Sequence, residues 1–180
     1  MKNSVFIATS LDGFIAGKNN ELDWLSTFPE IDDINTGFDD FTSQVDALLM
    51  GKNTFEIVAG FEGEWFYKKP VFVWSNSTPE LPSKFQGKAF LVKGTLKEVL
   101  SQIHKQGYKN LYIDGGKTIQ SFLKEDLIDE MIITTIPVLL GGGIPLFEDL
   151  PKQLVFTCKK TTLFLDKVVQ NHFVRLRETT

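Results

Sequence analysis

The stretch Asn110-Leu-Tyr-Ile-Asp-Gly-Gly-Lys-Thr-Ile-Gln-Ser-Phe-Leu123 decides the fold of this chain. An apolar run, Leu111 to Ile113, stops at Asp114 and is followed by two glycines. Apolar residues then recur at helical spacing as far as Leu123. The pattern predicts a strand that ends in a Gly-Gly turn and leads directly into a helix.

This Gly-Gly turn is suited to binding a phosphate group. Backbone N–H groups at the start of a helix point outward, and the helix dipole adds positive potential there. Gly115 and Gly116 also carry no side chain that would keep a ligand away from the main chain. A nucleotide site is therefore the first hypothesis, and a tight turn without a ligand is the structural alternative.

Two known phosphate-binding motifs do not fit the chain. A P-loop ending in Gly116-Lys117-Thr118 needs a glycine five residues before Gly116, where the chain has Leu111. The glycines at 141–143 would need a further glycine at Leu146 to complete a dinucleotide fingerprint. P-loop kinase and Rossmann interpretations are therefore disfavoured.

The composition is that of a soluble domain of enzyme size. A chain of 180 residues can fill one hydrophobic core, and 42% hydrophobic residues exclude a disordered chain. The net charge of −4 argues against nucleic acid as a partner, and no apolar run approaches the roughly 18 residues of a membrane span. Cys158 is the single cysteine, so an internal disulfide is excluded. We expect a single cytoplasmic domain over residues 1–180 that binds a small-molecule substrate.

Strand-like and helical stretches alternate along the chain. The predicted strands are Ser4–Ala8, Ala47–Met50, Val71–Trp74, Ala89–Val92, Leu111–Asp114, Met131–Val138, Val155–Leu165 and Val168–Leu176. The predicted helices are Phe38–Val45, Leu96–Lys105 and Lys117–Lys124. The last two strands join at Asp166-Lys167. The alternation predicts an α/β fold with a mostly parallel central sheet, helices on both faces and a C-terminal antiparallel hairpin.

Three other strands also end in polar residues. Gly51-Lys52-Asn53-Thr54 follows the second predicted strand, and Ser75-Asn76-Ser77 and Lys93-Gly94-Thr95 follow the next two. Ligands of open α/β sheets bind outside the carboxyl ends of the strands. Each loop alone is explained by solvent exposure. Together with the Gly-Gly turn, they favour a cofactor with several phosphates.

Four motifs, in this order, resemble the dihydrofolate reductase superfamily. They are Ser10-Leu-Asp-Gly-Phe-Ile-Ala16, Gly51-Lys-Asn-Thr54, Asp114-Gly-Gly-Lys-Thr118 and Gly141-Gly-Gly-Ile-Pro-Leu-Phe147. They are most similar to the reductase domain of the bifunctional riboflavin-biosynthesis deaminase-reductase. The resemblance implies a three-layer dihydrofolate reductase-like fold and an NADPH-dependent reductase. The zinc signature of the deaminase half is absent from the sequence, and neither histidine has metal-ligand spacing, so we expect no metal site.

The resemblance also implies which residues bind NADPH. The backbone of Ala8 would meet the nicotinamide carboxamide, and Trp24 would lie beside the cofactor unless it is a core aromatic residue. The strand-end loops would hold the phosphates, with Ser75 and Asn76 near the adenosine 2′-phosphate. The expected cofactor-binding residues are Ala8, Trp24, Gly51, Lys52, Thr54, Ser75, Asn76, Gly94, Gly115, Gly116, Lys117, Thr118 and Ile119.

Four carboxylates are candidates for the substrate side. Asp114 matches an acidic position that faces substrate in the riboflavin reductase, and Asp12 is either a substrate ligand or a turn residue before Gly13. Asp39 and Asp40 lie on the predicted helix where the folate enzyme carries its acid. The sequence does not choose between these two as the proton donor, and water is a further alternative.

The chain departs from the riboflavin reductase in its charge. That enzyme has arginines after its tryptophan that bind the ribose phosphate of its substrate, whereas residues 19–50 here contain no Lys or Arg. The same stretch contains the acidic residues Glu21, Asp23, Glu30, Asp32, Asp33, Asp39, Asp40 and Asp46. These carboxylates also suit a solvated helix face, and Lys68 or Lys69 could supply a cation from elsewhere. A neutral or cationic heterocycle, such as a pterin or aminopyrimidine, is the expected substrate.

Three expectations complete the sequence-based hypothesis. Lys52, Lys93 and Lys117 at strand ends favour NADPH over NADH. The apolar C-terminal hairpin predicts a homodimer, unless its side chains pack inward against helices. The alternative to a reductase is a non-catalytic NADPH-binding or ligand-sensing protein of the same fold.

Overall fold

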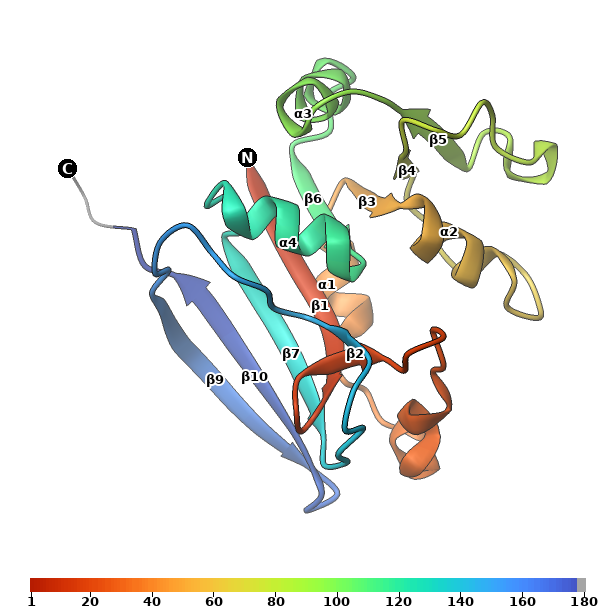
Figure 1. The fold of residues 1–180 in the computed structure, drawn as a ribbon. Helices are drawn as coiled ribbons and strands as arrows, with labels where there is room; N and C mark the ends of the chain where they lie inside the picture. Colours follow the sequence, from red (N-terminus) through yellow and green to blue (C-terminus); the bar gives the residue numbers. More distant parts are fainter. Residues whose placement is uncertain (178–180) are drawn as a thin grey trace.

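The computed structural model describes residues 1–177 (Figure 1). The strands are β1 (Lys2–Ser10), β2 (Phe14–Ala16), β3 (Ala47–Gly51), β4 (Val71–Trp74), β5 (Ala89–Val92), β6 (Asn110–Asp114), β7 (Glu130–Ile136), β8 (Ile144–Pro145), β9 (Phe156–Phe164) and β10 (Val168–Arg175). The α-helices are α1 (Phe38–Ser43), α2 (Lys52–Ala59), α3 (Leu96–Lys105) and α4 (Gly116–Lys124). Short 3-10 helices are η1 (Asp23–Thr27), η2 (Pro29–Asp33) and η3 (Ser83–Phe85).

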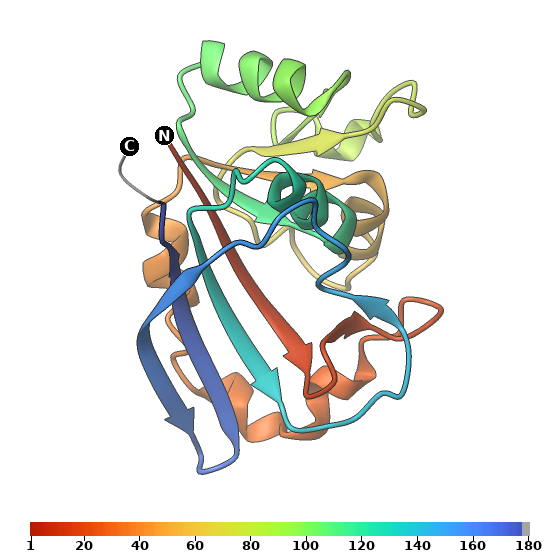
Figure 2. The same ribbon diagram turned by 60° about the vertical axis from the view of Figure 1, so that its left-hand side comes forward.

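Eight strands form the central sheet in the order β5-β4-β3-β6-β1-β7-β10-β9. The pairs from β5 to β7 are parallel, and β10 is antiparallel to both β7 and β9. The β9–β10 hairpin therefore forms one edge of the sheet, and β5 forms the other (Figure 2). This arrangement confirms the α/β class and the C-terminal antiparallel hairpin.

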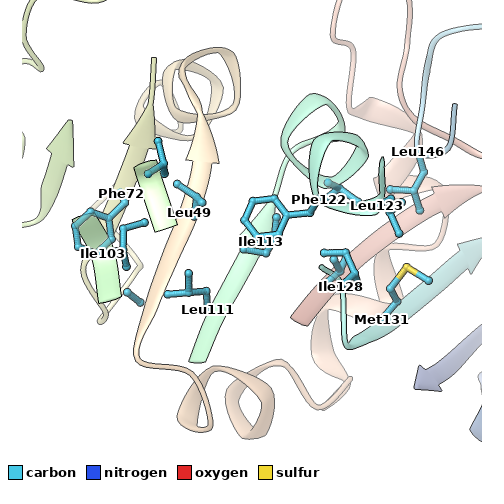
Figure 3. Packing of buried hydrophobic residues seen from close by; sticks show 14 of the residues in the cluster. Leu49, Phe72, Ile103, Leu111, Ile113, Phe122, Leu123, Ile128, Met131 and Leu146 are labelled. Atoms are coloured by element: carbon cyan, nitrogen blue, oxygen red, sulfur yellow. The ribbon is translucent and has the colours of Figure 1, made fainter. Parts of the chain in front are cut away.

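Helices cover both faces of the sheet because successive strand residues point to opposite sides. In β6, Leu111 and Ile113 are fully buried in a core cluster with α3 and α4, whereas Tyr112 is buried in a cluster with α1 and α2. Figure 3 shows part of the first cluster, with Phe122 of α4 lying over Ile113. The continuous apolar runs of the parallel strands are thus explained by burial on both sides.

The sequence pattern predicted the bounds of some helices better than those of others. Helix α3 has the predicted bounds because Thr95 and Glu98 form a complete capping box at its start. Helix α1 ends at Ser43, two residues earlier than predicted, and α4 begins one residue earlier, at Gly116. Helix α2 was not predicted. Phe55 is its one buried residue, so it lacks the long buried apolar stripe that identifies a helix.

A second, two-stranded sheet lies beside the carboxyl end of β1. Strands β2 and β8 pair through Phe14 with Pro145 and Ala16 with Ile144. Gly143 makes this pairing possible, since a Cβ there would lie 2.2 Å from the carbonyl oxygen of Ala16. In the part of the chain that the structure describes, no helix is long and apolar enough to cross a membrane.

Candidate functional site

A cavity of about 610 Å³ opens at the carboxyl ends of β3, β4 and β6. The first turns of α2 and α4 form one part of its wall, and β1, β2, η1 and the chain between α2 and β4 form the rest. The sequence-predicted residues that line it are Ala8, Gly51, Lys52, Thr54, Ser75, Asn76, Asp114, Gly115, Gly116, Lys117 and Thr118. The structure therefore brings most of the predicted cofactor residues together around one cavity.

Two helix N-termini meet at this cavity. Strands β3 and β6 are neighbours, with Met50 opposite Asp114, so the turns that follow them into α2 and α4 are adjacent. Within the described residues, neither helix has a side-chain cap, whereas α3, which starts elsewhere, has a full capping box. The first backbone N–H groups of α2 and α4 are thus left without intrahelical or side-chain acceptors. Such groups fit a pyrophosphate.

Glycines allow these two turns to approach each other. Gly115 has φ +86°, and a Cβ there would lie 2.2 Å from Thr54 Oγ1. A Cβ on Gly51 would lie 3.3 Å from Thr118 Oγ1. Each turn therefore packs its glycine against a threonine of the other helix. The close approach leaves main-chain atoms at the cavity surface.

Gly116 has a different role. A Cβ there would lie 2.9 Å from Ile15 Cδ1, in the second sheet. Both residues line the cavity. Glycine at this position thus lets β2 close over the start of α4.

The end of β4 contributes short polar side chains. Ser75 Oγ lies 2.8 Å from Thr78 Oγ1 and accepts a hydrogen bond from the Thr78 N–H. Asn76 Oδ1 accepts a hydrogen bond of 2.7 Å from the Gly94 N–H. Gly94 is outside the cavity lining and instead holds Asn76 in place. These hydrogen bonds fix the side chains of Ser75 and Asn76 at the cavity wall.

Two lysines of the cavity lining lie near the helix starts. Lys52 Nζ is 3.5 Å from Glu56, and Lys117 Nζ is 2.8 Å from Glu148. Both ion pairs are exposed, so they contribute little to stability and leave the lysines available to an anion. Lys93, the third lysine expected at the strand ends, is not part of the cavity lining.

Asp114 is the one acidic side chain that lines the cavity, among the residues described. Its carboxylate accepts hydrogen bonds from the Gly115 N–H at 2.8 Å and from the Tyr67 hydroxyl at 3.5 Å. Burial raises the pKa of Asp114 from 3.8 to about 6, although both hydrogen bonds act in the opposite direction. Burial and the Asp114 charge also raise the pKa of Tyr67, which therefore remains a hydrogen-bond donor.

Apart from Asn20, Asn53 and Ser121, the rest of the cavity wall is apolar, and sequence reasoning largely missed it. Its larger aliphatic and aromatic side chains come from β1, β2, β4, β8, the chain around η1, α2 and the chain between α2 and β4. They are Ile7, Ile15, Leu22, Leu25, Ile57, Val58, Phe61, Phe66, Trp74, Ile144 and the ring of Tyr67. The available signal was the aromatic run Trp65-Phe66-Tyr67, which is unusual between a helix and a buried strand.

Several predicted residues lie away from the cavity. Trp24 is 6% exposed and packs with Ile136 and Val168, and Ile119 is fully buried in the core. Asp39 and Asp40 are exposed in the first turn of α1. None of these four side chains lines the cavity.

Asp12 connects two loops through hydrogen bonds. Its carboxylate accepts hydrogen bonds from the backbone N–H groups of Leu140 and Gly141 and from the Ser10 hydroxyl. These hydrogen bonds, that of Ser10 above all, lower the pKa of Asp12. The turn after β1 is thereby attached to the segment between β7 and β8.

Comparison with known proteins agrees with this architecture. The family model of the RibD C-terminal domain matches residues 4–170, and the chain belongs to that family. The fold is that of dihydrofolate reductase: the enzyme from Enterococcus faecalis, solved with NADP(H), has a TM-score of 0.66 at 16% identity, covering 97% of this chain and 96% of that chain. This likeness defines the fold alone.

Two other relatives are similar over nearly their whole length. A crystal structure described as "Putative riboflavin biosynthesis protein" from Shewanella sp. PV-4 has a TM-score of 0.94 at 50% identity, covering 98% of this chain and all of that one. "Uncharacterized protein YwjB" of Bacillus subtilis (strain 168) is 36% identical over 178 residues, which span 97% of this chain and 98% of YwjB. The family and the reductase-like domain are thus defined.

The raised pKa of Asp114 predicts a pH-dependent cost to stability. The folded state holds the Asp114 proton up to about pH 6 and the unfolded state only to about 3.8, so the free energy of unfolding falls as pH rises through this window. The replacement Asp114→Asn removes the buried charge. The variant should be more stable than the wild type at pH 8, by roughly 1–3 kcal/mol, and equally stable near pH 4.

Urea denaturation at pH 4, 6 and 8 measures this difference. The exposed Asp39, outside the cavity, provides the control, because Asp39→Asn should not reproduce the gain in stability at pH 8. A difference between wild type and Asp114→Asn that does not change with pH would contradict the assignment of a buried, proton-holding carboxyl.

Proposed function

We propose that this chain is an NADPH-dependent reductase that delivers hydride to a small heterocyclic substrate of pterin or aminopyrimidine type. The observation that carries the proposal is the pair of uncapped helix N-termini, of α2 and α4, at adjacent strand ends. They open into the same cavity as an apolar compartment with a single carboxyl group among the described residues. Phosphate binding and a water-poor reaction site would thus be side by side.

The residues at the helix starts fit the cofactor. Gly51–Thr54 and Gly115–Thr118 would bind the phosphates through backbone N–H groups and the two threonine hydroxyls. Ser75 and Asn76 would hold the adenosine end. The family generally binds NADP(H), and the dihydrofolate reductase of the same fold was solved with it. Both facts support the choice of NADPH.

The chain's own contribution to chemistry is alignment and proton handling. When bound, NADPH would supply the hydride from C4 of its nicotinamide. Ala8 and the neighbouring apolar side chains would exclude water and keep the reacting rings in contact. Asp114, with a pKa of about 6, is able to accept a hydrogen bond from a substrate N–H group or to hold a proton close to neutral pH.

The phosphorylated substrate of the riboflavin reductase fits this cavity poorly. In the described part of the chain no arginine lines the cavity, and its two lysines are at the helix starts assigned to the cofactor. A second phosphate would compete for the same groups. The proposal therefore keeps the reductase chemistry of the family and departs from the phosphoribosyl substrate.

The first functional prediction concerns cofactor choice. The additional phosphate of NADPH, at the adenosine end near Ser75 and Asn76, would gain a charge-assisted contact with Lys52 or Lys117 of the same cavity lining, which corresponds to roughly tenfold to a hundredfold tighter binding than NADH. Calorimetric titration measures both dissociation constants. The variants Lys52→Met and Lys117→Met should reduce the preference, and Lys97→Met, on the exposed surface of α3, should not.

Turnover separates the reductase from the alternative, a non-catalytic NADPH-binding or ligand-sensing protein. Pterins, aminopyrimidines and quinone-like acceptors are added to protein and NADPH, and loss of the nicotinamide absorbance reports reduction. Equal affinity for NADPH and NADH would contradict the cofactor assignment. Tight NADPH binding without oxidation by any acceptor would favour the non-catalytic alternative.

We also propose that two copies pair through the β9–β10 hairpin. Strand β9 is at the edge of the sheet, and its residues 157–161 are exposed. Val155, Leu163, Leu165 and Leu176 are between 41% and 56% exposed, whereas Phe156 and Phe173 pack partly inward against the core. Such an edge is covered most simply by a two-fold dimer. The cavity lining contains no residue of this hairpin, so each site would be complete within one subunit.

Light scattering tests the pairing. The wild type should have about twice the chain mass of 20.4 kDa at micromolar concentration. Leu163→Glu should give a single chain with unchanged NADPH affinity, because a charge in the interface disrupts it. Leu139→Glu, at a residue that is 72% exposed and outside the hairpin, is the matched control. A wild-type mass of one chain would exclude the dimer without affecting the reductase proposal.

A further inference from the structure

We propose that Phe61, Phe66 and Tyr67 form an aromatic rim that selects a flat, unphosphorylated nitrogen heterocycle as the substrate. The inference rests on the proposed function, because it assigns the half of the cavity that the cofactor leaves free. The expected substrate has a ring system that stacks on the rim and a nitrogen that donates a hydrogen bond to Asp114, and it carries no phosphate.

The two phenylalanines of the rim are exposed although they are aromatic. Phe61 is 51% exposed and Phe66 is 49% exposed, and both line the cavity. Exposed apolar surface at a cavity marks a ligand-binding groove. The two phenylalanines are therefore the apolar surface that a bound ring would cover.

Packing of Trp65 holds the neighbouring rim residues Phe66 and Tyr67 in place. Trp65, next to Phe66, packs its ring 4.9 Å from that of Phe85 and 5.9 Å from that of Phe55 on α2. The Phe66 and Tyr67 rings are 4.1 Å apart. Because Trp65 anchors this segment in the core, a ligand that stacks on Phe66 would not have to order it first.

Rim and carboxylate lie on the same face of the sheet. Tyr112 of β6 points toward α1 and α2, and Asp114, two residues further along the strand, has the same orientation. The Tyr67 hydroxyl reaches Asp114 at 3.5 Å. A ring stacked on the rim would thus present its edge to the carboxylate, which accepts hydrogen bonds from N–H groups.

The charges near the rim do not suit a phosphate. Lys52 is at the start of α2, whereas Phe61 follows its far end, roughly 13 Å away along the helix axis. Lys69 is nearer the amino end of β3, beside Asp46, whose pKa is lowered by hydrogen bonds from the Asn110 and Lys109 N–H groups and, to a smaller extent, by the Lys69 charge. Lys68 is exposed and is not part of the lining. A phosphate at the rim would lose water without gaining a cationic partner.

Calorimetric titration with a matched pair of probes tests the inference. The protein is first saturated with NADP⁺, which prevents turnover, and is then titrated with neopterin or with neopterin phosphate. Neopterin should bind on the order of tenfold more tightly or better, because the phosphate is desolvated without a partner. The variants Phe61→Ala and Phe66→Ala should each weaken neopterin binding, by roughly fivefold to tenfold, with an unchanged NADP⁺ affinity.

Phe90→Ala is the matched control. Phe90 is 39% exposed on β5, outside the cavity, and its loss should leave the affinity for neopterin unchanged. Equal or tighter binding of the phosphorylated probe would overturn the inference, and so would unchanged neopterin affinity in both rim variants. Absence of neopterin binding by protein that binds NADP⁺ would likewise overturn it and leave the cofactor assignment intact. Failure to bind NADP⁺ would instead refute the proposed function.

Discussion

The close contact between two strand–turn–helix units is the constraint on which the rest of this structure depends. Because β3 and β6 are adjacent and in register, the turns into α2 and α4 lie side by side and must pack closely against each other. Gly115 against Thr54 and Gly51 against Thr118 make this possible, and a side chain at Gly115 would collide with its neighbour. This contact brings the starts of α2 and α4 together. Their first backbone N–H groups are then exposed at the strand ends, where the cavity lies.

Because side chains alternate along a strand, neighbouring residues of β6 have different roles at the cavity. Ile113 anchors α4 from one face, and Asp114 emerges at the strand end toward the other, where α2 and the aromatic rim are found. The same partly buried position that raises the pKa of Asp114 lowers the free energy of unfolding at neutral pH. Such a cost is typical of residues kept for a site rather than for the fold. Asp12 completes the enclosure by tying the turn after β1 to the segment that follows β7.

The parts predicted from the sequence are those governed by local rules. Buried parallel strands, the capping box of α3 and the Gly-Gly turn are local patterns, and they located the sheet and eleven of the lining residues. Helix α2 and the Tyr67–Asp114 contact were missed, since the first shows little apolar periodicity and the second joins residues 47 positions apart. Trp24 and Ile119 were expected near the cofactor but pack in the interior, because the direction of a side chain depends on tertiary contacts that a motif does not contain.

A crystal structure of the protein with NADP⁺ would show directly whether the two helix starts bind the cofactor. The pyrophosphate oxygens should lie within about 2.7–3.2 Å of backbone nitrogens in the first turns of α2 and α4. The nicotinamide should lie beside Ala8, with its open face toward Asp114 and the aromatic rim. A cofactor bound elsewhere, or a pyrophosphate that contacts neither helix start, would contradict the assignment of this cavity as an NADPH site.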